Sequence, residues 1–391
     1  MNKKIFFCGA MLGVSAAILS YIILNFAAGT IHFREQTDFT LEKKVNYIAE
    51  LLDKYYIEDV DTNVIVEGAY YGMLESIGDP YTSYLNAEQT SEYKDRVHGL
   101  IQGIGITVLY DPEKNMLTVV STIEGTPAEN AGILSGDMIY KVDGKNVQGM
   151  LSDDVIALIK GEAGTSVTVI VKRGNEEIEF IVERSPIELS SVYSKMLEGD
   201  IAYIEILGFK SNTYEQFIEE YESLLVQGAR GLIIDVRDNP GGIVQAVTQI
   251  ADELIPKGLI MYTVDKVGNK KEYMSDANSI SIPLVVLVNE NSASASEILA
   301  GAVQDSGTGE LVGMQTFGKG LVQDMYMLPD GSSIKLTIEK YYTPSGICIQ
   351  GYGITPDYIV ELKENEWKTV SDDGYDTQLQ TGVKVIKEKL N

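Results

Sequence analysis

Histidine and cysteine are scarce in this chain of 391 residues, which contains two of each. Cys8 lies in an apolar N-terminal run and Cys348 lies far from it, so a disulfide framework cannot organise the fold. Neither His32 nor His98 has the clustered cysteine or histidine neighbours of a zinc site. We therefore expect no metal, and no catalytic triad that needs a histidine in the C-terminal half.

Positive charge is also scarce, with 31 lysines and arginines against 57 acidic residues and a net charge of −26. Such an excess repels phosphate backbones, so the composition argues against nucleic acid as a partner. Hydrophobic residues make up 45% of the chain, which is enough to build real cores. The length predicts two or three folded units.

The first 30 residues form a separate segment. Two lysines precede Ile5–Ala28, which is almost free of charge. This run is longer than the roughly 7–15 apolar residues of a cleaved signal peptide and matches the roughly 20 that span a bilayer. It predicts a signal anchor in residues 1–30, with the rest of the chain outside the cytoplasm. Small residues at Ala27–Gly29 permit cleavage, so a secreted form remains the alternative.

Residues 36–96 read as a helical region. Apolar residues from Leu41 to Leu52 recur at steps of three and four, and a second helical stretch, Val64–Ile77, ends at a Gly-Asp-Pro stop. No chemistry is apparent there, and we expect the region to pack against a second subunit or the core.

Residues 97–186 change to short β-rich runs around one helix. The expected strands are Ile101–Leu109, Met116–Val120, Met138–Val142, Ser166–Lys172 and Glu177–Glu183. Ser152–Asp154 is expected to cap a helix that runs through Ile159, and Thr126–Gly132 to form a turn.

In residues 187–362, apolar strands alternate with helices. Gly231–Val236 and Leu284–Val288 read as buried strands, each followed by a helix, at Ile243–Leu254 and from Ala295 onward. This pattern predicts an α/β core whose strands are covered on both faces. The tail, 363–391, is polar and is expected to end in a short amphipathic helix.

Three serines, Ser292, Ser294 and Ser296, lie between a buried strand and the start of a helix. A hydroxyl there faces free N–H groups and the positive end of a helix dipole, which stabilise an alkoxide and an oxyanion. Serines at helix starts are also ordinary N-caps, and this pattern does not distinguish the three.

Lys319 stands between two glycines, just before a strand-like run that includes Gln323. A lysine in a dry pocket has a lowered pKa and serves as a general base, and an amide four positions away is expected on the same face. The alternative is an exposed lysine in a glycine turn. The pattern of a phosphate-binding loop is absent.

Two glycine-rich loops present backbone N–H groups. Asn239–Gly242 lies between a strand and a helix, which suits either an oxyanion hole or a tight turn. Gly103, Ile104, Gly105 and Ile106 precede a strand, as in loops that bind the carboxylate at the end of a peptide.

Together these segments resemble the C-terminal processing peptidases, tail-specific serine proteases of family S41 that carry a PDZ module. The resemblance extends from about Ile48 to Asp357. The segments that carry it are Ser292–Glu297, Gly301–Asp305, Thr316–Gln323, Asn239–Gly242, Tyr342–Gly346, Gly353–Asp357 and Asp79–Thr82.

The resemblance implies a crotonase- or ClpP-like protease core, an inserted PDZ domain and an N-terminal helical arm. It makes Ser294 the nucleophile, Lys319 the general base and Gln323 the residue that orients the lysine. The implied oxyanion donors are Ala295 and either Gly241 or Gly242. The loop Gly103–Ile106 would bind the substrate carboxylate.

The resemblance thus implies an extracytoplasmic endopeptidase acting near the C-termini of proteins, with no cofactor and with a homodimer as an option. One departure is Asp238, where the family usually has asparagine, beside the implied oxyanion site. Two alternatives are a non-catalytic, membrane-tethered PDZ scaffold and a crotonase-type acyl-CoA enzyme.

Overall fold

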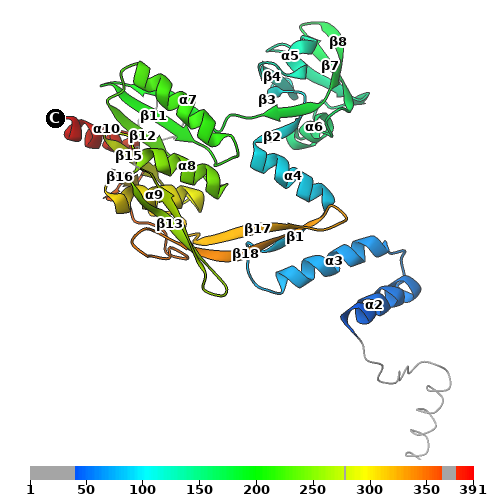
Figure 1. The fold of residues 1–391 in the computed structure, drawn as a ribbon. Coiled ribbons are helices and arrows are strands. Elements are labelled where there is room, and N and C mark those ends of the chain that lie inside the picture. Colours follow the sequence, from blue (N-terminus) through cyan, green and yellow to red (C-terminus); the bar gives the residue numbers. More distant parts are fainter. Residues whose placement is uncertain (1–39, 277–278, 363–375) are drawn as a thin grey trace, which may run out of the picture. The chain divides into compact units, whose positions relative to one another are not determined.

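The computed structural model describes residues 40–276, 279–362 and 376–391, and the chain divides into two units, Met1–Ser76 and Ile77–Asn391 (Figure 1). The expected anchor in residues 1–30 lies outside the described residues. Among the helices that are described, none is both long and apolar enough to span a bilayer.

The described part of the first unit consists of two helices. Helix α2, Leu41–Tyr55, begins at the N-cap Thr40, and α3, Thr62–Glu75, begins at Asp61, whose carboxylate accepts the Asn63 N–H at 2.9 Å. Neither helix contains a buried residue.

Residues 77–98, just before the β module, are only partly helical, although the whole of 36–96 was predicted to be a helical region. Helix α4, Ala87–His98, starts with a capping box between Asn86 and Gln89 and ends at Gly99 in the left-handed region. Before it lies β1, Ser83–Leu85, which pairs antiparallel with β18, Ser333–Tyr342. A three-residue strand has too few positions to show alternation, so the sequence pattern missed it.

Residues 100–188 form the β module. Its six-stranded sheet has the order β3-β4-β5-β7-β8, with β6 beside β5, and a separate pair, β2 with β9, closes the module. The strands are β2 Leu100–Gly103, β3 Ile106–Asp111, β4 Met116–Thr122, β5 Met138–Val142, β6 Lys145–Asn146, β7 Ser166–Arg173, β8 Glu176–Glu183 and β9 Ser185–Glu188.

Three local expectations for this module were wrong. The predicted strand Ile101–Leu109 is broken into β2 and β3 at Gly105, whose φ is +87°. The segment expected as a turn contains the short helix α5, Pro127–Ala131. In α6, Ser152–Ile159, the N-cap is Leu151 with no side-chain hydrogen bond, so Ser152 is the first helical residue rather than the cap.

The core is built on a six-stranded sheet of order β10-β11-β12-β15-β16-β19, parallel except at the β10–β11 pair. Its strands are β10 Val192–Leu197, β11 Ile201–Ile206, β12 Gly231–Asp235, β15 Leu284–Val288, β16 Gly309–Gly313 and β19 Tyr358–Ile359. Every residue of β11, β12 and β15 is buried, on both faces of the sheet. Continuous apolar strands therefore mark a sheet covered on both sides, as expected.

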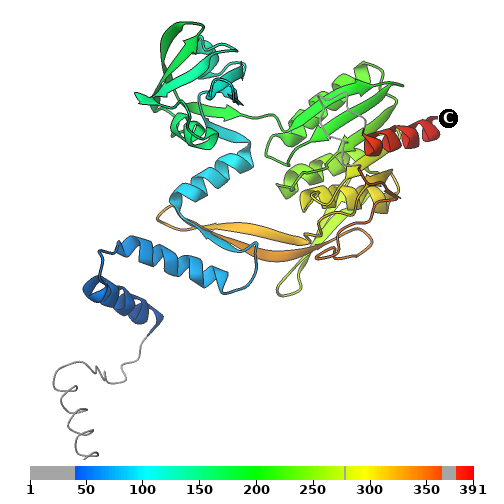
Figure 2. The same ribbon diagram turned by 180° about the vertical axis from the view of Figure 1, so that it is seen from behind.

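Helices cover the two faces of this sheet. Alternate residues such as Leu232 and Ile234 pack with α7 Thr213–Val226, α8 Val244–Leu254 and α9 Ala295–Ser306. Ile233 and its neighbours pack on the other face against α10, Thr377–Leu390 (Figure 2). The helix predicted in the tail is thus present, and its N-cap Asp376 pairs with the buried Arg237 at 2.8 Å.

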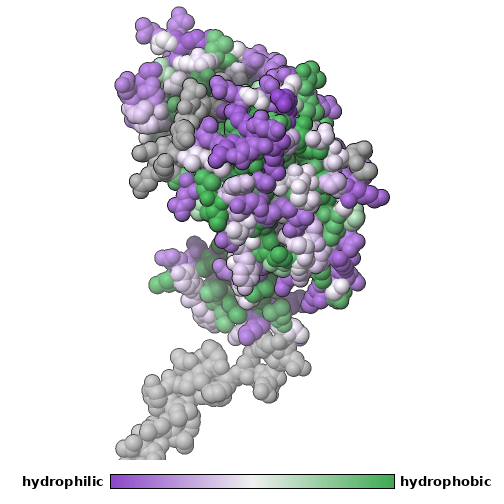
Figure 3. Space-filling model, turned by 90° about the vertical axis from the view of Figure 1, so that its left-hand side faces the viewer, coloured by the Kyte–Doolittle hydropathy of each residue, from purple (hydrophilic) through white to green (hydrophobic). Residues whose placement is uncertain are grey.

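A second, five-stranded sheet holds β1 against the core. Its order is β1-β18-β13-β14, with β17 also pairing with β18. The remaining strands are β13 Gly258–Asp265, β14 Lys270–Ser275, β17 Leu321–Met327 and β18 Ser333–Tyr342. On the face in Figure 3, hydrophilic side chains cover much of the surface and apolar ones form separate patches, as the acidic composition leads one to expect.

Candidate active site

The three serines differ in what their hydroxyls do. Ser292 is fully buried and donates to the Val236 carbonyl at 2.7 Å. Ser296 is also fully buried and donates to the Asn239 carbonyl at 2.9 Å. Ser294 is only half-buried. Two of the hydroxyls are therefore occupied in holding the loop, and Ser294 is the one of the three serines with appreciable exposed surface.

Ser294 has an unusual backbone for its position. It is the N-cap residue of α9, where extended backbone is usual, but its φ is +55° and its ψ is −110°. Non-glycine residues are strained at positive φ, and such strain is concentrated at functional sites. The Ala295 N–H follows directly after it, whereas the Ser296 and Glu297 N–H groups donate to the carbonyls of Ala293 at 3.1 Å and Ser294 at 2.9 Å.

Glu297 links the serine loop to the lysine loop. Its carboxylate is fully buried and accepts the Ser294 N–H at 2.8 Å and the Lys319 N–H at 2.9 Å. It also accepts the Thr316 hydroxyl at 2.6 Å and the Gly318 N–H at 2.7 Å. Four bonds to one buried carboxylate fix the two loops relative to each other.

The loop Asn239–Gly242 lies against Ser294. A Cβ at Gly241 would fall 2.8 Å from the Ser294 Cβ and 2.9 Å from the Ala295 nitrogen, and its φ is +100°. A Cβ at Gly242 would fall 2.0 Å from the Phe209 carbonyl oxygen. Both positions require glycine, because the loop backbone passes too close to the serine loop and to Phe209 to leave room for a side chain.

Asp238 does not place a free charge at this loop. It is exposed, and its Oδ1 accepts from the side-chain amides of Asn289 at 2.7 Å and Asn291 at 2.9 Å. The two amide groups therefore satisfy the carboxylate of Asp238, the residue at which this sequence departs from the usual family pattern.

Lys319 is half-buried, and the glycines around it are tightly packed. A Cβ at Gly318 would fall 2.8 Å from the Gly353 nitrogen, and one at Gly320 would fall 2.7 Å from the Gln350 nitrogen. Burial, and then the ammonium of Lys335, lowers the pKa of Lys319 below its usual 10.5, although Asp79 and Glu297 raise it. The alternative of a freely exposed lysine in a turn does not fit this environment.

The Lys319 ammonium lies 4.7 Å from the centroid of the Tyr81 ring. Within the described part of the chain, no hydrogen bond joins it to the Ser294 hydroxyl. The Gln323 amide donates to the Thr337 hydroxyl at 3.5 Å and makes no hydrogen bond to Lys319 in the described residues. A β-bulge lies between Val322 and Gln323. It interrupts the regular alternation of side chains from which Lys319 and Gln323 were expected to share a face.

Three family profiles match the chain: "Peptidase family S41" over residues 200–360, "PDZ domain" over 118–173 and "Activating protease CtpB N-terminal domain" over 27–89. The carboxy-terminal processing protease CtpA of Bacillus subtilis (strain 168) is 35% identical over 364 residues, which cover 92% of this chain and 78% of that protein. The chain belongs to peptidase family S41. It is a serine peptidase that carries a PDZ domain.

Other comparisons agree with the S41 assignment. The carboxy-terminal-processing protease of Bartonella bacilliformis is 34% identical over 374 residues, covering 92% of this chain and 83% of that protein. A solved structure described as a putative S41 protease from Bacteroides fragilis NCTC 9343 covers 92% of this chain and all of its own, with a TM-score of 0.52 and 13% identity. That structure supports the fold. The expected fold class, a mixed α/β peptidase with an inserted PDZ domain and an N-terminal helical region, is confirmed.

The PDZ domain of this S41 peptidase has a groove of about 310 Å³. Gly103, Ile104, Gly105 and Ile106 all line it, as do apolar residues of α6 and the single cationic side chain of Lys160. A larger residue at position 105 would displace Thr126, since a Cβ there would fall 2.3 Å from the Thr126 side chain.

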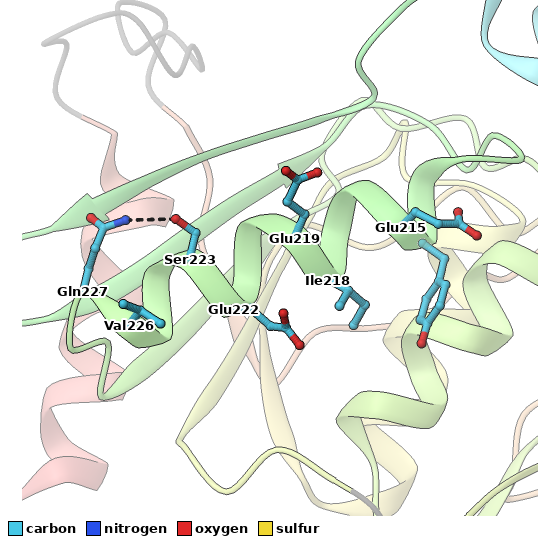
Figure 4. Close-up of a pocket in the computed structure, with 8 residues that line it drawn as sticks. Glu215, Ile218, Glu219, Glu222, Ser223, Val226 and Gln227 are labelled. Carbon is cyan, nitrogen blue, oxygen red and sulfur yellow. Dashed lines mark hydrogen bonds between the residues drawn. The ribbon is translucent and has the colours of Figure 1, made fainter.

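A second hollow lies away from this chemistry, along α7 (Figure 4). Its lining includes the carboxylates of Glu215, Glu219 and Glu222 and comes from one helix and its C-cap. The residues that line this hollow in the described structure include no lysine or histidine.

Sequence reasoning assigned no role to four residues that the structure places at the S41 site: Glu297, Thr316, Asp79 and Tyr81. Glu297 stands three positions after Ser294, the spacing of a capping box, which could have singled it out. Asp79 and Tyr81 come from a segment more than two hundred positions away in the chain, and no spacing rule connects them with Lys319.

Proposed function

We propose that Ser294 is the nucleophile and Lys319 the general base of an endopeptidase that works through an acyl-enzyme. The observation that carries this proposal is the carboxylate of Glu297, which accepts one backbone N–H from each of these residues. A strained, half-buried serine and a half-buried lysine are thus anchored to the same buried group.

The lowered pKa of Lys319 suits it to this role. As a neutral amine it would accept the proton of the Ser294 hydroxyl while the oxygen attacks the substrate carbonyl. The resulting ammonium would donate that proton to the leaving amine. A water molecule, deprotonated by the same amine, would then release the acyl group.

The proposed oxyanion donors are the N–H groups of Ala295 and Gly242. The Gly241 N–H already donates to the Asn239 side chain at 2.8 Å, which favours Gly242 of the two glycines. Ala295 opens α9, so its N–H has no partner within the helix and the helix dipole adds to the field.

Catalysis on this scheme requires the Lys319 side chain to leave the Tyr81 ring and reach Ser294. The backbone of Lys319 is fixed by Glu297, whereas its four-carbon side chain is free to rotate. The role of Gln323 in orienting the amine similarly requires its amide to leave Thr337, a long bond at 3.5 Å.

For substrate selection, we propose that the PDZ groove binds the free C-terminus of a protein through the N–H groups of the loop Gly103–Ile106. The groove is lined mainly by isoleucine, leucine and valine, which favours chain ends with apolar residues. The relatives described as carboxy-terminal processing proteases support cleavage near C-termini.

We further propose that the chain acts outside the cytoplasm, anchored by the apolar run in residues 1–30, with a secreted form as the alternative. Fractionation of cells that express the full chain distinguishes the two. A homodimer through α2 and α3 is also proposed, because these helices bury no residue and expose apolar side chains such as Ile48 and Met73. Sedimentation of the chain with and without the two helices tests it.

The catalytic proposal is tested by labelling the full chain with a fluorophosphonate and by following cleavage of an apolar-ended peptide. Ser294→Ala should abolish both signals, and Lys319→Ala should lower cleavage at least about 1,000-fold, with thermal melting nearly unchanged. The same peptide with a C-terminal amide should be cleaved more slowly, because the PDZ loop loses the carboxylate. Labelling that persists in Ser294→Ala would show that another residue is the nucleophile.

The rival is a PDZ scaffold without peptidase activity. It predicts that the wild-type chain binds the peptide but takes up no probe at any pH.

A further inference from the structure

The turn Asp79–Thr82 precedes β1 and is closed by its own side chains. The Asp79 carboxylate accepts the Tyr81 N–H at 3.0 Å and the Thr82 hydroxyl at 2.6 Å. The Thr82 oxygen in turn accepts the Thr337 N–H at 3.1 Å, and β1 continues the attachment by pairing with β18. The turn is therefore part of the sheet that carries β17 and β18.

The turn reaches the proposed base from one side. The Tyr81 ring lies under the Lys319 ammonium at 4.7 Å, within the range of a cation–π interaction. Asp79 is one of the two carboxylates whose charge acts on Lys319, the other being Glu297.

The turn reaches Gln323 through Thr337. The Thr337 hydroxyl accepts the Gln323 amide at 3.5 Å, and the Thr337 N–H donates to the Thr82 hydroxyl, which in turn donates to Asp79. Lys319 and Gln323 are thus both in contact with one turn, Lys319 through a ring and Gln323 through a threonine.

We propose that the turn Asp79–Thr82 positions the catalytic base, with the Tyr81 ring as the resting place of the Lys319 ammonium and Asp79 as the anchor that holds Thr337 and Gln323 in place. This inference rests on the proposed function for its catalytic meaning. Tyr81 and Asp79 are positioning residues, because they act through Lys319 and Gln323.

The charges around Lys319 determine in which direction each substitution should shift its pKa. Lys335 of β18 opposes its protonation, and Asp79 and Glu297 favour it. The face of the Tyr81 ring also favours the ammonium form. Removing the ring while keeping an apolar cover therefore lowers the pKa of Lys319 further, and so does removing the Asp79 charge.

The experiment measures the pKa of Lys319 directly, by competitive acetylation of the full chain across a pH series with mass-spectrometric readout of each lysine. In Tyr81→Leu, the midpoint for Lys319 should fall by roughly 0.5 to 1 pH unit. Tyr81→Phe keeps the ring and should match the wild type. Lys384, whose side chain is 75% exposed, is the internal reference and should not move.

Asp79→Asn is the second variant, with Asp330→Asn as its matched control. Asp330 lies at the far end of the β17–β18 hairpin from Lys319, where it caps Ser332. We expect Asp79→Asn to lower the Lys319 midpoint and Asp330→Asn to leave it unchanged. The acid limb of kcat/KM for peptide cleavage should move by the same amount as the midpoint in each variant.

The two proposals fail separately. If the midpoint moves in Tyr81→Leu but no Ser294-dependent cleavage exists, the function is wrong and the turn still holds the lysine. If cleavage is present and both the midpoint and the acid limb stay in place in Tyr81→Leu and Asp79→Asn, the role of the turn is overturned. Thermal melting of each variant shows whether it has folded.

Discussion

The two halves of the proposed active site are held in different ways. On the serine side, the supporting groups have no exposed surface, and their hydrogen bonds are short, as for Ser292 to Val236 at 2.7 Å and Asn239 to the Ile206 carbonyl at 2.8 Å. On the lysine side, Lys319 is half-buried and contacts an aromatic ring, and Gln323 makes one bond of 3.5 Å.

This difference distinguishes the proposed nucleophile, which is held rigidly, from the proposed base, whose side chain has fewer contacts. Groups held by several buried bonds do not move without breaking the core, whereas a side chain with few contacts can change rotamer at little cost. Control of activity is therefore expected on the lysine side, where the side chain alone has to move. Glu297 fixes the backbone on both sides, so that movement is confined to the side chain.

The largest expected effect breaks the fixed side. Gly241→Ala adds a Cβ 2.6 Å from the Ala293 carbonyl oxygen at a residue whose φ is +100°, so the serine loop has to shift. We expect kcat/KM to fall about 100-fold or more, because the oxyanion geometry is lost. Gly268→Ala is the control: its φ is +91°, but nothing lies within 4 Å of the added atom. Equal activity of the two variants would mean that the close approach at Gly241 is unimportant.

A smaller effect measures how rigid the serine side is. Ser296→Ala removes the 2.9 Å donor to the buried Asn239 carbonyl, which keeps the Ala293 N–H at 3.0 Å, and should cost about 0.5–1.5 kcal/mol of unfolding free energy. Ser306→Ala, at the exposed end of the same helix, removes a comparable bond to Val303 and should cost less than about 0.5 kcal/mol. Urea unfolding of both variants gives the comparison, and similar losses would show that the serine loop is no better held than the surface.

The smallest effect concerns the pH dependence of stability. Because the pKa of Lys319 is lowered from 10.5 on folding, the unfolded chain binds more protons between the lowered value and 10.5, and stability rises with pH across that window. Lys319→Met removes this dependence and should be more stable than the wild type below the window, with the two converging above it. Thermal melts across the alkaline range test this against Lys384→Met, which should show no such change. A wild-type slope that persists in Lys319→Met would place the titration elsewhere.

Sequence patterns identified the segments of the site well. The apolar runs Gly231–Val236 and Leu284–Val288 gave strands within a residue of those observed, and the helix after the serines begins at Ala295 as expected. These segments are long and uniformly apolar, so local pattern and tertiary environment agree. The same reasoning missed β1 and joined β2 and β3 into one strand, because a three-residue strand and a glycine break carry little periodic signal.

The distinction between the serines was beyond local reasoning. Ser292, Ser294 and Ser296 are alike in sequence, and burial separates them only once β12 and the Asn239 loop lie alongside. A face shared by Lys319 and Gln323 was expected from spacing and stays a prediction; no sequence pattern indicated the bulge between Val322 and Gln323.

By itself, the sequence determined the chemical possibilities: a serine loop, a glycine-bracketed lysine and no histidine to serve the core, since composition and motif order are properties of the chain alone. Only the tertiary structure decided which serine keeps exposed surface, that the Gly241 N–H donates to Asn239, and that Tyr81 and Asp79 act on the lysine. The physical reason is that burial and contact depend on segments far apart in the chain, and local periodicity does not record which of them meet.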